Sequence, residues 1–294
     1  MARHLSLPVV LALLSVYLVW GSTYLAMRLA IEAVPPLLMS GLRYTVAGVL
    51  LLAFLRWRGM PWPARRQWRD AGMVGVLLML GGNGLVGLAM ERGVSSGMSA
   101  LLVSLTPLFA LLFASFWGQP VQRRDWLGIA LGLGGIAILN SGQELSASPA
   151  GALLLMSAAL IWAFGSIWGK HLQQPPAFMA GAVQMLVGGL ALLLAGALSG
   201  EVITTVPPAK ALWAMAYLVL LGSLLGFTAY AWLLANVRPA LATSYAYVNP
   251  VVAVVLGVWL GGEQVEPVEW AGMAVMLAGV VLVCWPGAAG HKSG

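Results

Sequence analysis

The sequence predicts an all-α membrane protein with ten transmembrane helices, built as two inverted five-helix repeats. Hydrophobic residues make up 61% of the 294 residues and charged residues only 8%, which is more apolar surface than a soluble chain of this length could bury. The apolar residues run continuously, whereas a transmembrane β-barrel needs apolar and polar residues to alternate. The two halves of the chain also share a residue pattern at a nearly constant spacing, as an internal duplication would.

Each predicted span is an apolar run close to the roughly 20 residues that a helix needs to cross a bilayer. We expect the first run to be retained rather than cleaved as a signal peptide, because it stays apolar for longer than such a segment and shows no small-residue cleavage site. The fifth run is the shortest and the richest in glycine, and no loop is long enough for a soluble domain. In order, the predicted spans are 7–27, 34–55, 71–90, 97–117, 126–141, 149–169, 177–198, 212–234, 240–260 and 268–286.

Basic residues divide unequally between the two sides of such a bundle, and this bias sets its orientation. With the N-terminus in the cytoplasm, eleven of the fifteen Lys and Arg residues fall on the cytoplasmic side and three outside, while seven of the nine acidic residues fall outside. The cytoplasmic residues are Arg3, Arg56, Arg58, Arg65, Arg66, Arg69, Arg123, Arg124, Lys170, Arg238 and Lys292. Both termini are therefore predicted to be cytoplasmic. Five spans per repeat then require the second repeat to enter the membrane from the opposite side.

Matched residue pairs define the two predicted units, 1–142 and 143–294. Trp20 precedes Arg28 by eight residues, as Trp162 precedes Lys170. The other matched pairs are Gly48 with Gly189, Pro107 with Pro250, Trp126 with Trp270 and Gly128 with Gly272. Gly128 and Gly132 are spaced for close helix contact. Inverted repeats commonly build alternating-access transporters whose substrate site lies between the repeats.

The polar stretch from Thr243 to Pro250 lies inside the ninth span. Two Tyr, a Thr, a Ser and an Asn precede Pro250, which removes a backbone hydrogen bond and favours a break in the helix. Ser104 to Pro107 is a weaker copy in the fourth span. Lipid cannot hydrogen-bond such groups, so we expect them to face protein or a wet cavity. Pro107 and Pro250 are therefore predicted to be gates or kinks.

Several of these stretches resemble a known transporter family. They are Trp20-Gly21-Ser22-Thr23-Tyr24, Gly82-Asn83-Gly84, Trp162-Ala163-Phe164-Gly165-Ser166, the run 239–250, and Gly261-Gly262-Glu263. The chain is similar over nearly its whole length to the drug/metabolite transporter superfamily, and within it to the EamA-type exporters and their YedA-like branch. The resemblance implies a multi-pass protein of the bacterial inner membrane that exports small metabolites, often amino acids or related compounds. The chain departs from the pattern at Gly118-Gln119-Pro120, where the first half lacks the corresponding Glu.

Arg43 is the costliest residue of the predicted spans, because an Arg near the centre of a membrane helix costs about 2.5 to 3.5 kcal/mol to insert. Two interpretations stay open. Arg43 either binds a carboxylate or other anionic group of the substrate, or forms a structural bridge to backbone carbonyls or to Glu91. Gln184 occupies the matching place in the second half, so the repeat itself does not require the charge.

A wider set of polar and aromatic residues is predicted to contact the substrate. Tyr245 and Tyr247 lie within a span, where the preference of Tyr for the membrane interface does not explain them. An aromatic wall would suit apolar, aromatic or cationic substrates, although Asn83 also suits helix packing and Ser166 a backbone hydrogen bond. The predicted substrate-binding residues are Trp20, Thr23, Tyr24, Arg43, Asn83, Trp162, Ser166, Tyr245, Tyr247 and Asn249.

Few titratable groups are placed to couple transport to protons. No Asp or Glu lies near the centre of a predicted span, and the three His are terminal or in a loop. The coupling candidates are therefore Glu91 and Glu263, near span ends. Facilitated diffusion down a metabolite gradient and proton coupling both remain open, and the second includes proton-coupled efflux of cationic or multidrug compounds.

Other classes of protein fit the sequence less well. Ser166 has no His within a span to act as its base, and neither a His/Glu metal cluster nor a Walker-type loop is present. We therefore expect no enzyme, metal, cofactor or ATP, and the single Cys284 allows no intrachain disulfide. The expected partners are a small-molecule substrate and the lipid bilayer, without nucleic acid. The oligomeric state stays open, with a monomer as one option, as does a structural or receptor role without transport.

Overall fold

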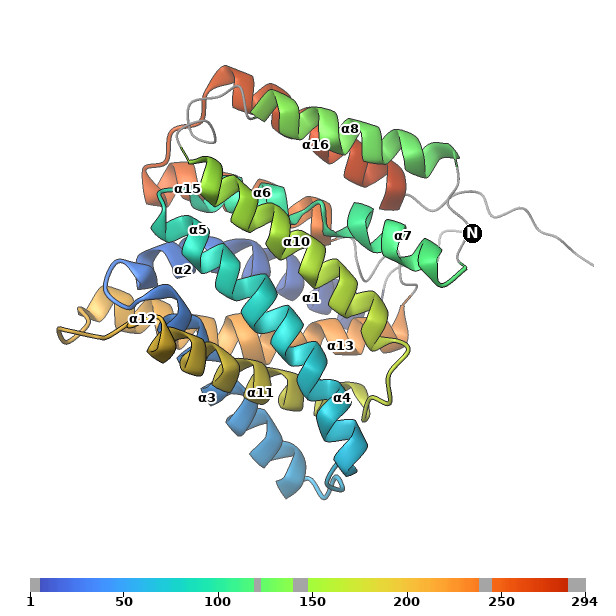
Figure 1. Ribbon diagram of the computed structural model, residues 1–294, viewed down its shortest axis with the longest axis vertical. Helices are drawn as coiled ribbons and strands as arrows, with labels where there is room; N and C mark the ends of the chain where they lie inside the picture. Colours follow the sequence, from blue (N-terminus) through green and yellow to red (C-terminus); the bar gives the residue numbers. More distant parts are fainter. Residues whose placement is uncertain (1–5, 119–122, 140–147, 238–244, 285–294) are drawn as a thin grey trace, which may run out of the picture.

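The computed structural model describes residues 6–118, 123–139, 148–237 and 245–284, and every regular element in these ranges is helical (Figure 1). The first half comprises α1 Leu7–Leu14, η1 Ser15–Trp20, α2 Gly21–Ile31, α3 Pro36–Trp57, α4 Arg65–Gly75, η2 Val76–Gly84, α5 Leu85–Glu91, α6 Ser96–Val103, α7 Thr106–Phe116 and α8 Arg123–Leu139. The second half comprises α10 Pro149–Gly169, α11 Ala177–Leu198, α12 Ala209–Tyr217, η3 Leu218–Leu225, α13 Gly226–Asn236, α15 Tyr245–Gly261 and α16 Pro267–Cys284. The segments η1, η2 and η3 are π-helical turns inside longer helices.

Among the described residues, seven helical stretches are long and apolar enough to cross a membrane. They are Leu7–Ile31, Pro36–Trp57, Arg65–Glu91, Ser96–Phe116, Pro149–Gly169, Ala177–Leu198 and Ala209–Tyr230. These stretches fall on the first four predicted spans and on the sixth, seventh and eighth. Two shorter apolar helices, Asp125–Ile138 and Val248–Gly261, fall on the predicted fifth and ninth spans.

Helices α3 and α11 pack against each other at one end of the molecule, at the bottom of Figure 1. A Cβ added at Gly48 would lie 2.5 Å from the backbone nitrogen of Leu186, and a Cβ added at Gly189 would lie 2.5 Å from that of Thr45. Gly41, earlier in α3, meets Leu193, later in α11. Residue numbers therefore rise along one helix as they fall along the other, so the two helices are antiparallel. The matched glycines 48 and 189 make equivalent contacts, as a two-fold relation requires.

Helices α8 and α16 form a second pair at the opposite end, at the top of Figure 1. A Cβ added at Gly135 would lie 2.9 Å from the carbonyl oxygen of Gly272, and a Cβ added at Gly279 would lie 2.5 Å from that of Gly128. The second Cβ would also lie 2.8 Å from the backbone nitrogen of Gly132. The close contact predicted from Gly128 and Gly132 is therefore confirmed, and this pair is also antiparallel and reciprocal.

Helix ends and π-helical turns also recur at matching places. Gly59 follows α3 with φ +84° and Gly200 follows α11 with φ +80°. Only glycine adopts this left-handed conformation without strain, so both positions end a helix in the same way. The π-helical turns η2 and η3 also occupy corresponding positions, each between two α-helical parts of one long span.

The fourth predicted span is interrupted, whereas the described part of the ninth, from Tyr245 onward, is continuous. Helix α6 ends at Val103 and α7 begins at Thr106, with Pro107 in its first turn, where the missing N–H removes no helical hydrogen bond. Helix α15 runs unbroken from Tyr245 through Pro250. The expected helix break at Pro250 is therefore wrong for the described residues. A proline inside a helix removes one backbone hydrogen bond, and the remaining bonds here keep both sides helical.

Candidate functional site

Arg43 lies two turns into α3 and only 3% of its surface is exposed. Its Nε donates a hydrogen bond to Ser223 Oγ at 2.9 Å, and its guanidinium carbon lies 4.6 Å from the centre of the Tyr44 ring. The bridge to Glu91 that one interpretation proposed is not formed, and Glu91 is exposed at the end of α5. Nη1 of Arg43 is buried and has no hydrogen-bond partner among the described residues. A buried charged donor without a partner is costly. An anionic ligand would supply the missing hydrogen-bond acceptor.

Thr23, one of the predicted site residues, lies beside this guanidinium. A Cβ added at Gly222 in η3 would lie 2.9 Å from Thr23 Cγ2 and 3.2 Å from Arg43 Nη2. A side chain at position 222 would therefore shift Thr23 and press on the guanidinium of Arg43. Tyr24 is the next residue of α2 after Thr23. Helices α2 and α3 and the turn η3 thus bring these groups to one place, which we call the Arg43 site.

Trp20, at the end of η1, belongs to an aromatic group that we call the Trp20 group. The centre of its ring lies 5.6 Å from that of Phe227, 5.2 Å from that of Tyr230 and 5.0 Å from that of Tyr245. Trp20 Nε1 donates a hydrogen bond to the carbonyl oxygen of Gly222 at 3.0 Å. Gly222 therefore contacts both the Trp20 group and the Arg43 site, so the two are neighbours.

Trp162 makes the equivalent contact in the second half of the chain. A Cβ added at Gly82 in η2 would lie 2.5 Å from Cε3 of Trp162, and a Cβ added at Gly226 would overlap the ring of Trp20. Asn83 follows Gly82 and is half-buried, as is Ser166 in α10. Trp162 packs against a buried cluster that includes Tyr44. Phe227 of the Trp20 group packs on the same buried cluster.

The ninth span contributes Asn249 beside α2. Asn249 is 7% exposed, and its Oδ1 has no hydrogen-bond partner among the described residues. Its backbone oxygen lies 3.3 Å from where a Cβ of Gly21 would stand. The side chain of Tyr247 lies outside the described residues. Asn249 therefore stands next to the residue that follows Trp20, with an amide oxygen free for a donor.

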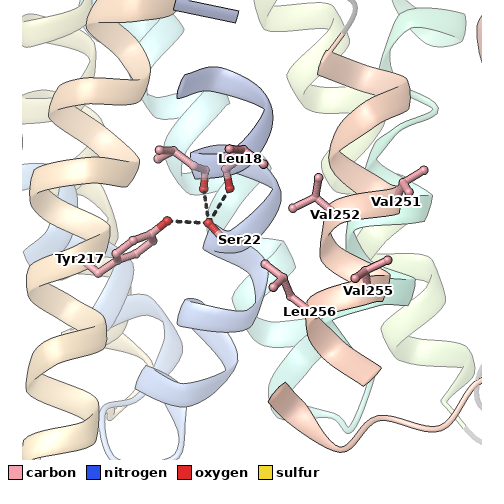
Figure 2. Close-up of a pocket in the computed structure, with 8 residues that line it drawn as sticks. Leu18, Ser22, Tyr217, Val251, Val252, Val255 and Leu256 are labelled. Carbon is pink, nitrogen blue, oxygen red and sulfur yellow. Dashed lines mark hydrogen bonds between the residues drawn. The ribbon is translucent and has the colours of Figure 1, made fainter. Parts of the chain in front are cut away.

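A cavity of about 430 Å³ lies between η1, α2, α12 and α15 (Figure 2). Its walls are mainly aliphatic, with Val251, Val255 and Leu256 on the α15 side. Ser22 and Tyr217 supply hydroxyl groups that are hydrogen-bonded to each other at 2.5 Å, as Figure 2 shows. None of the predicted substrate-binding residues lines this cavity, so it is separate from the Arg43 site.

Glu263 follows α15, at the end of the bundle where α2 ends and α6 begins. Only 3% of its side chain is exposed. Oε1 accepts hydrogen bonds from Arg28 Nη1 at 2.5 Å and from the backbone N–H of Ser96 at 2.8 Å. Oε2 accepts a hydrogen bond from the backbone N–H of Gly97 at 3.1 Å. One carboxylate thus joins α2, the start of α6 and the end of α15.

Sequence reasoning missed Ser223, Phe227 and Tyr230, all of which lie in the eighth span. One signal was present, because Gly222 and Gly226 are four residues apart, a spacing that predicts close helix approach. The spacing does not identify the partner, which the structure shows to be Trp20.

The chain matches the EamA-like transporter family twice, over residues 7–141 and 149–285. It is 46% identical over 277 residues to the Escherichia coli (strain K12) protein named "uncharacterized inner membrane transporter YedA", covering 94% of this chain and 90% of that protein. It is 25% identical over 288 residues to the Salmonella typhimurium (strain LT2) protein named "probable amino-acid metabolite efflux pump", covering 92% and 93%. A crystal structure shares the fold, with a TM-score of 0.66 at 20% identity, covering 94% of this chain and 96% of its own.

Proposed function

The chain belongs to the EamA-like transporter family and is a multi-pass protein of the bacterial inner membrane, and from this premise we propose that it exports small carboxylate-bearing metabolites by alternating access. Amino acids and related compounds are the proposed substrate class. The relative named as a probable amino-acid metabolite efflux pump supports that class, and the Arg43 site supports it independently.

We propose that ten membrane helices form two inverted five-helix repeats, 1–142 and 143–294, with both termini cytoplasmic. Two observations support the repeats. The family matches the chain twice, and the pairs α3/α11 and α8/α16 each bring corresponding helices together in antiparallel, reciprocal contact. The distribution of Lys and Arg supports the orientation.

The observation that carries the substrate class is Nη1 of Arg43, which is buried and has no hydrogen-bond partner among the described residues. Ser223 holds Nε of Arg43, which leaves Nη1 for a ligand. A carboxylate binds a guanidinium with two parallel hydrogen bonds, and such charge-assisted bonds are about twice as strong as neutral ones. When the transporter opens towards the cytoplasm, the substrate carboxylate would take this place.

The neighbouring Trp20 group suits the other charge of an amino acid. Aromatic ring faces attract an ammonium group, and Gly222 contacts both the rings and the arginine. A zwitterion would satisfy both features. A purely cationic drug would meet the aromatic rings but also the charge of Arg43, so the rings alone favour cationic efflux while the complete site favours amino acids.

We propose that export follows the metabolite gradient without a coupled proton. Among the described residues, no carboxylate forms an ion pair with Arg43. This supports the uncoupled mechanism, because coupling through a shared carboxylate would require an acidic group at this site for which substrate and proton compete.

Counterflow in proteoliposomes tests this proposal. Proteoliposomes that contain the purified protein are loaded with unlabelled amino acids. Uptake of labelled amino acids is then compared with uptake of labelled amino-acid amides, which lack the carboxylate. We expect Arg43→Gln to lower the preference for the acid over the amide about tenfold or more, because a site built to bind a group discriminates strongly against its absence.

Arg92→Gln, the same change at an exposed arginine, is the matched control and should keep the preference. Unchanged discrimination in Arg43→Gln would remove Arg43 from the site. A pH gradient that accelerates counterflow of a substrate with constant charge would overturn the uncoupled mechanism.

A further inference from the structure

We propose that Glu263 is a gating residue, whose carboxylate holds shut the side of the transporter where α2 ends and α6 begins. In the proposed orientation this is the outer side. The proposal rests on the proposed alternating-access function, because only a transporter of that kind must open and close this side in turn.

The hydrogen bonds and the ion pair of Glu263 join the two halves of the chain. Arg28 and Ser96 belong to the first half and Glu263 to the second, so the contacts must break when α15 separates from α2 and α6. The Arg28 side chain is 39% exposed and that of Glu263 only 3%. A pair with one buried partner is screened less by water than a surface pair. The two backbone donors belong to the N-terminus of α6, which favours a negative charge.

Two glycines leave the space that the Glu263 carboxylate occupies. A Cβ added at Gly257 would overlap Glu263 Oε2 and lie 3.1 Å from Ser96 Oγ. A Cβ added at Gly97 would lie 2.9 Å from Val254 Cγ2. The helices therefore meet at a separation that only glycine permits. The carboxylate occupies the remaining space, where it satisfies backbone donors that would otherwise be buried without a partner.

Two other acidic residues at this end of the bundle also contact the opposite half of the chain. Neither combines a buried carboxylate with a charged partner and backbone donors. Lys210 and Glu32 form an ion pair at 3.0 Å, but both side chains are more than half exposed, and such pairs contribute little. Glu201 accepts hydrogen bonds from the backbone N–H groups of Leu37 and Leu38, but it joins α3 to the end of α11. Glu201 forms no ion pair with a described residue, so it caps the start of α3 without a charged partner. Glu263 instead combines its backbone donors with the guanidinium of Arg28.

The sequence makes the proposed gate asymmetric. Lys170 is the counterpart of Arg28, but Gln119 stands where the first half would need the counterpart of Glu263. A glutamine carries no charge to pair with Lys170. The sequence therefore has a charged pair, Arg28 and Glu263, in one half of the match and no carboxylate at the position that corresponds to Glu263 in the other. Differential stabilisation of one state shifts the population towards it, so the resting transporter favours a closed outer side and an open cytoplasmic side. That is the side from which an exporter collects its substrate.

Accessibility of a reporter cysteine tests the gate without any knowledge of the substrate. Leu25 in α2 is 7% exposed and its Cδ1 lies 3.0 Å from where a Cβ of Gly261 would stand, so the end of α15 covers it. Intact cells producing Leu25→Cys are treated with a membrane-impermeant maleimide, with the chain lacking this substitution as background. We expect the reporter to be protected. Adding Glu263→Gln should speed labelling about tenfold or more, since it removes a charge-assisted hydrogen bond.

Glu201→Gln is the matched control, because it makes the same isosteric change in a helix-capping carboxylate at the same end. It should leave the reporter protected. Arg28→Gln should speed labelling as Glu263→Gln does, and the double variant should add little to either, because both changes remove one interaction. Arg28→Gln also provides the test if Glu263→Gln fails to accumulate in the membrane.

Unchanged labelling in both single variants would overturn the gate, and so would equally fast labelling in Glu201→Gln, which would indicate general loosening. Counterflow of amino acids is measured on the same variants. Faster labelling without counterflow in any of them would support the gate and overturn the amino-acid assignment, so the two failures are distinguishable.

Discussion

Replacing Gly189 with alanine would place a methyl carbon 2.5 Å from the backbone nitrogen of Thr45 and 3.0 Å from its Cα. Backbone atoms cannot swing aside as the end of a flexible side chain can, so α3 and α11 would have to move apart. Overpacking of this kind costs about 1 to 3 kcal/mol. Alanine also has a higher helix propensity than glycine, by up to about 1 kcal/mol. The overpacking cost therefore has to be measured against another Gly→Ala variant that gains the same helix propensity.

Gly181→Ala supplies that comparison. Gly181 lies in the same helix, and a Cβ added there would have no atom within 4 Å. The difference in free energy of unfolding between the two variants therefore isolates the helix contact, and we expect Gly189→Ala to be less stable by about 1 to 3 kcal/mol. Denaturant titration in detergent micelles, followed by tryptophan fluorescence, measures it.

Gly48→Ala should destabilise the protein to a similar extent as Gly189→Ala, because each glycine makes the contact of its counterpart. Equal stability of Gly189→Ala and Gly181→Ala would refute the close packing of α3 and α11. A loss in Gly189→Ala without one in Gly48→Ala would refute the reciprocal arrangement.

Three further predictions concern single polar contacts. Ser223→Ala removes the acceptor for Nε of Arg43 and should raise the KM of amino-acid counterflow about tenfold; an unchanged KM would contradict the positioning role. Trp20→Phe keeps the aromatic contacts but loses the hydrogen bond to η3, so it should lower the free energy of unfolding by about 1 kcal/mol, and equal losses in Trp20→Phe and Trp20→Ala would argue against the ring contacts. Asp70→Leu leaves the backbone N–H of Gln173 without its carboxylate acceptor and should cost about 1 to 3 kcal/mol, with Asp70→Asn milder; the same denaturant titration compares them.

Local patterns in the sequence predicted much of the fold. Apolar runs marked the described helices because a membrane helix needs a continuous stretch of a fixed length. The matched glycines 48 and 189 proved to touch each other's helices, since helix backbones approach closely only where side chains are absent. Pro107 marked a real interruption for a similar reason, as proline is accepted at the start of a helix and here begins α7.

Interactions between distant residues were harder to predict. Nothing near Arg43 in the sequence indicates that Ser223, 180 residues away, would hold it. The choice of Glu263 as the partner of Arg28 likewise depends on the packing of three helices. The predicted helix break at Pro250 was wrong, because the loss of one backbone hydrogen bond does not decide whether the rest of the helix persists. These contacts were therefore open at the level of sequence, although the residues that make them were identifiable as unusual.

The antiparallel contact between α3 and α11 also bears on biosynthesis. Gly189 is made 141 residues after Gly48, which at cellular translation rates of about 5 to 20 residues per second is a delay of roughly 7 to 28 s. During that interval the glycine-lined face of α3 lacks the helix that covers it. Arg43 on the same helix waits longer for its partner, because Ser223 follows Gly189 by 34 residues. A nascent chain halted before α11 should accordingly be a preferred target of membrane proteases. The cell would therefore have to protect the first half from degradation until the second half is synthesised.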